Sequence, residues 1–215
     1  MSLTLHAHPL SSFCHKVLIA FYENDTPFKQ AMVDLGSPDG AAAFKALWPV
    51  ARMPLLRDDA RDVTLPESSI IIEYLQDFYP GRTRFIPQDP DLALQVRLAD
   101  RFYDLYVQQP SQKHIFDILR PADAKDPYGV GEARKLLTTA LDLVERDMTG
   151  RTWAIGDAFT LADCAAAPAL FYADKLLPLA KAHPNAARYL ERLKQRPSYA
   201  RTLKEAEPYF AMYPG

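Results

Sequence analysis

The sequence is poor in cysteine and histidine, which excludes two common kinds of small structural module. Its 215 residues include only two cysteines, Cys14 and Cys164, and they are far apart with no CxxC spacing. We therefore expect neither a disulfide framework nor a zinc module, and each thiol is most simply a buried core residue. The five histidines do not cluster with carboxylates at metal-ligand spacing, so no metal site is predicted.

The chain also lacks a strong net charge and a long apolar run. Its 25 Lys and Arg nearly balance 27 Asp and Glu, giving a formal charge of -2, which does not favour a nucleic-acid partner. No apolar stretch approaches the roughly 20 residues that span a bilayer. The first six residues lack the basic start and long apolar segment of a signal peptide. We expect a cytoplasmic protein with no membrane partner.

The composition, 48% hydrophobic and 24% charged, is that of an ordinary globular protein. The two halves of the chain differ in the spacing of their apolar residues. From Leu3 to about Tyr79, short runs with the apolar–polar alternation of strands are interspersed with runs of helical periodicity. Beyond Asp91 every long segment has helical periodicity. Turn-forming residues separate the halves. The sequence predicts an α/β domain over residues 1–80, a linker over 81–86 and an all-helical domain over 87–215.

The expected elements follow from apolar spacing. In the first half we predict strands at residues 3–7, 28–33, 54–57 and 63–65, with helices at 11–23, 41–47 and from just after Pro66 to 78. Their order is β-α-β-α-β-β-α. In the second half we predict a long helix at 92–119, interrupted or bent at Pro110, and helices at 130–148, 161–177, 186–195 and 198–206.

The first candidate for chemistry is Ser11-Ser12-Phe13-Cys14, where the first strand gives way to the first helix. A helix N-terminus offers free N–H groups and partial positive charge, which stabilise a thiolate, and a serine hydroxyl would add a donor. The alternative is that Ser11 or Ser12 only caps the helix. Cys14 is either a nucleophile near the helix start or a buried apolar residue, and we favour burial.

The second and third candidates each also have a plain structural explanation. Pro54 opens a short strand; if the Met53-Pro54 bond is cis, the Met53 backbone would turn outward and could pair with an extended peptide. Otherwise Pro54 is an ordinary edge-strand proline. Glu67-Ser68 at a helix start would fit an amino-acid head group, with Ser68 and the helix facing its carboxylate and Glu67 its ammonium. The same pair is also favoured in a first helical turn for stability alone.

Taken together and in order, these motifs resemble the glutathione S-transferase family along nearly the whole chain. The matching stretches are Ser11 to Val17 in Ser-x-x-x-x-x-Val, Trp48-Pro49-x-x-x-Met53-Pro54-x-Leu56, Pro66-Glu67-Ser68-x-Ile70-Ile71-x-x-Tyr74-Leu75, and Gly156-Asp157-Ala158-Phe159-Thr160-Leu161-Ala162-Asp163. The resemblance implies a thioredoxin-like N-terminal domain, an α-helical C-terminal domain, glutathione as co-substrate and a homodimer. In the last stretch it implies a capping box, in which Thr160 and Asp163 start a helix.

The resemblance also implies roles for individual residues. Ser11 would hydrogen-bond and activate the glutathione sulfur, as in the serine-type classes, and Ser12 competes with it for that role. Met53 would pair its backbone with the cysteinyl unit, and Arg52 would meet the glycine carboxylate unless it is a solvated surface charge. The γ-glutamyl end would be held by Glu67 and Ser68, and Asp100 resembles an acidic residue that reaches glutathione across the dimer.

An electrophilic apolar substrate would bind between the two halves. The residues expected to line its pocket are Leu10, Tyr103, Tyr106, Pro110 and His114, and the aromatic tail at 209–214 would lie beside them. For each residue the alternative is core or dimer packing, or a tail that only covers the first domain.

The activity expected from the resemblance is transfer of glutathione to an electrophile, with a role in detoxification. One rival is a non-catalytic binding or regulatory protein of the same fold. Another uses glutathione for peroxide or disulfide reduction, or for isomerisation. The isomerase class has a motif resembling Ser-Ser-Cys-Ser at this turn, whereas here Phe13 replaces the cysteine. The thiol-transfer classes have cysteine at the position of Ser11. Both departures favour the transferase.

Overall fold

A four-stranded mixed sheet forms the centre of the first half of the computed structural model, which describes residues 2–214. The strand order is β2-β1-β3-β4, with β1 parallel to β2 and the other neighbours antiparallel. The elements are β1 (Leu3–Ala7), α1 (Ser12–Glu23), β2 (Lys29–Met32), α2 (Pro38–Leu47), β3 (Leu55–Asp58), β4 (Val63–Pro66) and α3 (Ser68–Phe78). The predicted β-α-β-α-β-β-α order is therefore confirmed, and each strand end lies within one residue of its expected position.

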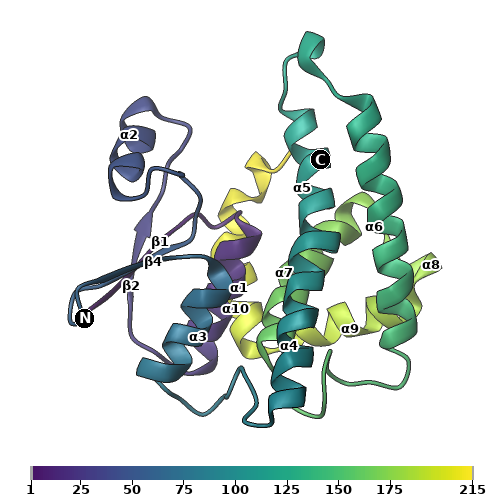
Figure 1. Ribbon diagram of the computed structural model, residues 1–215. Helices are drawn as coiled ribbons and strands as arrows, with labels where there is room; N and C mark the ends of the chain where they lie inside the picture. Colours follow the sequence, from purple (N-terminus) through teal and green to yellow (C-terminus); the bar gives the residue numbers. More distant parts are fainter. Residues whose placement is uncertain (1, 215) are drawn as a thin grey trace.

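The second half is helical (Figure 1). Its elements are α4 (Pro90–Phe102), η1 (Tyr103–Gln108), α5 (Gln109–Ile118), η2 (Ala122–Ala124), α6 (Pro127–Asp147), α7 (Leu161–Leu176), α8 (Leu179–Ala182), α9 (Pro184–Gln195), α10 (Pro197–Ala206) and η3 (Glu207–Met212). Several helices begin two or three residues before the expected position because a proline occupies their first turn, where its missing N–H costs nothing. No helix within residues 2–214 has the length and apolarity to cross a membrane.

The expected long helix at 92–119 is divided into α4, a π-helical segment and α5. Pro110 explains why the expected long helix departs from regular α-helical geometry. It has no N–H to donate, and its ring would collide with a carbonyl one turn earlier in a regular α-helix. The wider turn of η1, which ends two residues before Pro110, accommodates both effects.

The two halves share one hydrophobic core, with α1 and α7 packed against each other at its centre. Helix α7 is buried along most of its length, and its start carries the expected capping box between Thr160 and Asp163. Phe85, inside the segment expected as a linker, is fully buried, and its carbonyl accepts a hydrogen bond from the Leu161 amide. The connection between the halves is thus part of the core.

Candidate functional site

The strand register brings three chain segments to one end of the sheet. His6 pairs with Leu55, and Leu55 pairs with Pro66. The β1–α1 turn leaves the sheet just beyond His6, the loop ending in Pro54 enters it just before Leu55, and α3 starts just beyond Pro66. The predicted segments around Ser11, Met53-Pro54 and Glu67-Ser68 therefore adjoin one another in space, although 56 positions separate Ser11 from Glu67.

Ser11 is the N-cap of α1, and its Oγ accepts a hydrogen bond from the Cys14 amide at 3.4 Å. It is partly exposed, whereas Ser12 is only 6% exposed. Because the amide uses a lone pair of the Ser11 hydroxyl, the O–H proton stays available to another acceptor. Of the two hydroxyls that the sequence left open, Ser11 is the more accessible.

The thiol of Cys14 has the opposite environment. Burial raises its pKa to about 11, and its side chain has no exposed surface. The nearby Ser11 side chain and His8 backbone lower this pKa only in part. The expectation that Cys14 is a buried residue is confirmed, and a thiol in this state is a poor nucleophile at neutral pH.

Side chains from two helices fix the turn that carries Ser11. His15 on α1 contacts the Pro9 carbonyl through Nε2 at 2.5 Å, and Tyr172 on α7 donates its hydroxyl to the Leu10 carbonyl at 2.8 Å. Burial lowers the pKa of His15 to about 4, so the ring is neutral and Nε2 carries the proton that the carbonyl accepts. Neither role has a signal in the sequence, because both side chains act on backbone carbonyls outside their own elements.

The Met53-Pro54 peptide bond is cis. Among residues 2–214, neither the N–H nor the C=O of Met53 takes part in a loop or turn hydrogen bond. The Met53 backbone is therefore available for strand-like pairing with an extended ligand. Arg52 beside it is exposed and forms no ion pair with another described residue.

Glu67 and Ser68 lie at the start of α3. Glu67 has φ of 71°, a left-handed conformation that is strained for a residue with a side chain, and such residues cluster at binding sites. Its carboxylate is exposed and Ser68 is 5% exposed. An exposed carboxylate, a hydroxyl and the free N–H groups of an 11-residue helix thus occupy one place.

Asp100 differs from the sequence expectation of a residue that reaches a ligand, because its side chain is only 3% exposed in the chain. Lys16 Nζ lies 2.5 Å from one carboxylate oxygen of Asp100 and 2.8 Å from Asp104, and Ser69 donates to Asp100 at 2.8 Å. We call Lys16, Ser69, Asp100, Arg101 and Asp104 the Lys16 cluster. The one signal of this cluster in the sequence is a lysine, Lys16, directly before the apolar run Val17 to Phe21, and nothing there shows its partners.

The expected pocket residues divide by burial. Tyr103 belongs to the core at 5% exposure and Pro110 is buried, so neither presents a face to a ligand here. Tyr106 is 47% exposed and His114 is partly exposed. Leu10 lies in the fixed turn beside Ser11.

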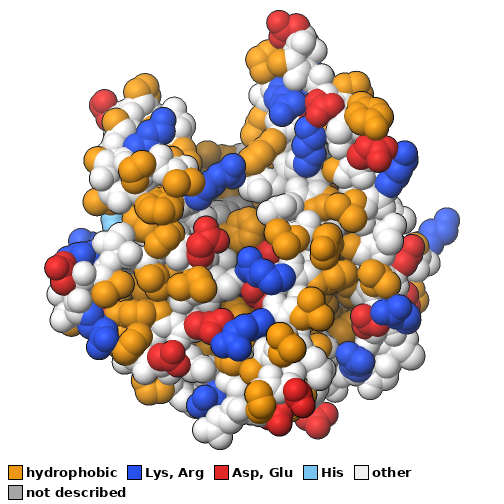
Figure 2. All heavy atoms as spheres, viewed as in Figure 1, with side chains coloured by type: hydrophobic (Ala, Val, Ile, Leu, Met, Phe, Trp, Pro, Cys, Tyr) orange, Lys and Arg blue, Asp and Glu red, His pale blue; other side chains and the backbone are white. Residues whose placement is uncertain are grey.

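The C-terminal tail reaches the β1–α1 turn. Tyr209 packs edge-on against His8, with ring centres 5.8 Å apart, and Tyr213 stacks on Tyr172 at 5.2 Å. The space-filling view shows a notch between the lobe that carries α2 and the α5–α6 hairpin (Figure 2). The arrangement offers an anion-stabilising helix start at Ser11, a free backbone segment at Met53 and an exposed carboxylate at Glu67, all at one end of the sheet.

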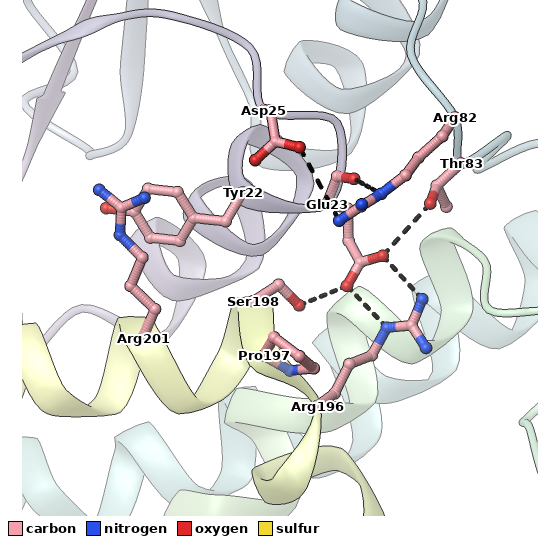
Figure 3. Close-up of a pocket in the computed structure, with 9 residues that line it drawn as sticks. All are labelled: Tyr22, Glu23, Asp25, Arg82, Thr83, Arg196, Pro197, Ser198 and Arg201. Carbon is pink, nitrogen blue, oxygen red and sulfur yellow. Dashed lines mark hydrogen bonds and ion pairs between the residues drawn. The ribbon is translucent and has the colours of Figure 1, made fainter.

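A cavity of about 430 Å³ lies away from this site, where the C-terminal end of α1 meets the start of α10 (Figure 3). Its charged side chains mostly pair with one another. Glu23, 5% exposed, accepts bonds from Arg196 at 2.6 and 2.7 Å and from Ser198 at 2.5 Å. Thr83 also donates to Glu23. These interactions join the two halves of the chain beside the cavity, and we call Glu23, Thr83, Arg196 and Ser198 the Glu23 clamp.

Two family models match the chain, one described as "Glutathione S-transferase, N-terminal domain" over residues 5–83 and one as "Glutathione S-transferase, C-terminal domain" over residues 109–192. Glutathione S-transferase GstB of Escherichia coli strain K12 is 27% identical over 208 residues, covering 94% of this chain and 97% of that protein.

Two solved structures extend the comparison. A glutathione S-transferase from Methylobacillus flagellatus with GSH bound gives a TM-score of 0.86 at 24% identity, covering 94% of this chain and 98% of that one. A glutathione S-transferase from Methylobacterium radiotolerans in complex with glutathione sulfonate gives a TM-score of 0.81 at 27% identity, covering 93% of each chain. The predicted fold class, a thioredoxin-like domain followed by a helical domain, is confirmed.

Proposed function

Because the chain belongs to the glutathione S-transferase family, we propose that it binds glutathione, ionises its thiol and adds the thiolate to an electrophilic apolar small molecule. In this reaction the sulfur loses its proton to solvent, and the thiolate forms an S–C bond to an electrophilic carbon. A substitution expels a leaving group with its bonding electron pair, whereas an addition breaks a π bond of the electrophile, whose electron pair then takes a proton from solvent. Ser11 and the start of α1 favour the ionised sulfur, and the protein lowers the barrier by holding thiolate and electrophile together.

The observation that carries the proposal is the state of Ser11. Its Oγ caps α1 by accepting from the Cys14 amide, which leaves the hydroxyl proton to donate to a sulfur anion. A hydrogen bond to the charged form of an acid lowers its pKa, and the partial positive charge of a helix N-terminus acts in the same direction. Ser12, the competing hydroxyl, is nearly buried.

The rest of the glutathione molecule would extend along the same end of the sheet. Its cysteinyl unit would pair with the Met53 backbone, its glycine carboxylate would meet Arg52, and its γ-glutamyl end would lie at Glu67 and Ser68. Glutathione-bound relatives of the same fold support this ligand class. The roles of these residues are part of the proposal.

The electrophile would enter from the notch, beside Leu10, Tyr106, His114 and the aromatic tail. We place the protein in the cytoplasm as a homodimer. An exposed apolar stripe on α4, with Leu94 68% and Leu98 69% exposed, is a surface that a second copy would cover. Sedimentation should then show a species of twice the 24.2 kDa chain mass.

The non-catalytic rival and the reductase rival make different demands on the site. A binding protein of this fold needs no thiol-activating group, yet Ser11 is accessible at the helix start. A reductase that worked through Cys14 would need a reactive thiol, whereas this one is buried with a raised pKa. Both observations favour the transferase.

The experiment that tests the proposal is calorimetric titration of the protein with reduced glutathione. We expect saturable one-site binding, and a Ser68→Ala variant should bind about tenfold more weakly, because it loses a hydrogen bond to a charged group. Thr138→Ala, which removes an exposed hydroxyl on α6, is the control and should leave binding unchanged. An absence of binding at millimolar glutathione would contradict the proposal and leave the non-catalytic protein.

A further inference from the structure

Arg101, near the end of α4, lies against the start of α3. Its Nη2 bonds to Ser69, the residue after Ser68, and lies 2.9 Å from Asp100 and 2.5 Å from Asp104. Its Nε donates to Asp100 at 3.1 Å. Among the hydrogen bonds of residues 2–214, none uses Nη1, and the side chain is 45% exposed. Two nitrogens of the guanidinium are therefore anchored, and the third is free at the surface.

The anchoring is rigid because the rest of the Lys16 cluster is buried. Lys16 is 1% exposed and bonds to both aspartates, so these carboxylates cannot turn toward solvent. Two positive and two negative groups balance within the cluster. Arg101 is its only member with a substantially exposed side chain, so within the cluster it alone has a donor nitrogen that a ligand can reach from solvent.

The free edge of Arg101 lies close to a group of opposite charge. Burial alone would lower the pKa of Arg101, but neighbouring carboxylates raise it, and Glu67 is one of them. The exposed Glu67 carboxylate and the Arg101 guanidinium thus flank the first turn of α3. An anionic and a cationic side chain at one helix start match the ammonium and carboxylate that a free α-amino acid carries on a single carbon.

We propose that Arg101 binds the α-carboxylate of the γ-glutamyl unit through Nη1, while Glu67 faces its ammonium. Arg101 is then a specificity-determining residue supplied by the helical half, in the place where the sequence suggested Asp100. The inference rests on the proposed glutathione binding and adds which part of glutathione is recognised, and by what. Ligands that lack the α-carboxylate should be discriminated against.

The test compares two ligands by calorimetry, glutathione and γ-aminobutyryl-cysteinyl-glycine, which lacks only the α-carboxylate. Wild-type protein should bind glutathione at least about tenfold more tightly than the analogue, because the analogue lacks the carboxylate that Arg101 and Ser68 would contact. Arg101→Ala should bind glutathione about tenfold more weakly and the analogue within about twofold of wild type. The difference between the ligands, rather than the loss itself, identifies the contact.

Arg97→Ala is the matched control, because Arg97 lies one turn earlier on α4, is similarly exposed and pairs with Glu73. It should change neither affinity. If circular dichroism shows that Arg101→Ala does not fold, the same comparison is made with Arg101→Lys. This variant keeps the positive charge without the planar guanidinium, so it should lose part of the preference for glutathione over the analogue.

Three results would overturn the inference. Equal weakening of both ligands by the Arg101 variant would mean that Arg101 only supports α3, and no weakening would mean that it makes no contact. Equal binding of both ligands by wild type would remove the α-carboxylate from recognition while leaving the proposed function intact. If wild type bound neither ligand, the proposed function itself would fail.

Discussion

At the scale of single residues, two positions three apart on one helix show how environment assigns chemistry. Ser11 lies before the first turn of α1, accessible and at the positive end of the helix. Cys14 lies one turn later on the buried face, where desolvation raises its pKa to about 11. The thiol of Cys14, intrinsically the stronger nucleophile, is thereby unreactive at neutral pH. The hydroxyl of Ser11 has the position suited to stabilising a ligand's thiolate.

Replacing Ser11 with alanine should therefore raise the pKa of bound glutathione and lower kcat/KM about 10- to 100-fold at neutral pH, because one donor to the charged sulfur is lost. The measurement is thiolate absorbance of the glutathione complex as a function of pH, together with conjugation rates for a reactive aromatic electrophile.

Cys14→Ala is the matched control and should keep the thiolate titration and the rate within about twofold. If Ser11→Ala were as active as wild type while Cys14→Ala were inactive, chemistry would run through the protein thiol. The reductase reading would then replace the transferase.

At the scale of elements, α1 connects the sheet to the helical half through an unusual residue. Lys16 is 1% exposed on the buried face of α1, and it bonds to α3 through Ser69 and to the α4–η1 segment through Asp100 and Asp104. A buried ion pair adds little stability by itself, but removing one partner leaves unpaired charge in the core. The Lys16 cluster thus fixes how three elements meet beside the candidate site.

Lys16→Met should destabilise the protein by about 3–5 kcal/mol, because it leaves two carboxylates without their buried cation. Urea denaturation followed by circular dichroism measures this loss. The triple variant Lys16→Met/Asp100→Asn/Asp104→Asn should recover at least about 1 kcal/mol, since its buried groups no longer carry charge. A triple variant less stable than Lys16→Met would contradict this account of the cluster.

At the scale of the whole molecule, the two halves form one folding unit held at two places. One is the shared core between α1 and α7, and the other is the clamp around Glu23. Burial alone would raise the pKa of Glu23, but hydrogen bonds from Arg196, Ser198 and Thr83 lower it below the ordinary value of 4.5. The clamp therefore depends on the ionised carboxylate.

The sign of the pH effect follows from that lowered pKa. The clamp contributes its full stability above about pH 4.5, the ordinary value, and loses it as the pH falls through the folded-state pKa. At pH 7, Glu23→Gln should be about 2 kcal/mol less stable than wild type, and the difference should disappear in acid. Thermal unfolding across this pH range measures both.

Glu73→Gln is the control for this pH effect, because it removes the exposed pair with Arg97 and should cost less than about 1 kcal/mol at any pH. A Glu23→Gln variant whose deficit stayed constant down to the lowest pH would show that packing, rather than charge, holds the clamp.

Local signals in the sequence predict the element order, the helical second half and the three candidate segments around Ser11, Pro54 and Glu67, because apolar periodicity, prolines and caps act over a few neighbouring residues. The capping box of Thr160 and Asp163 and the break near Pro110 belong to this class. Only the tertiary structure decided that Asp100 is paired internally and that Tyr103 is core. It likewise brought Arg101 to the start of α3. These facts depend on contacts between residues far apart in the chain, which the spacing of residues within one element does not specify.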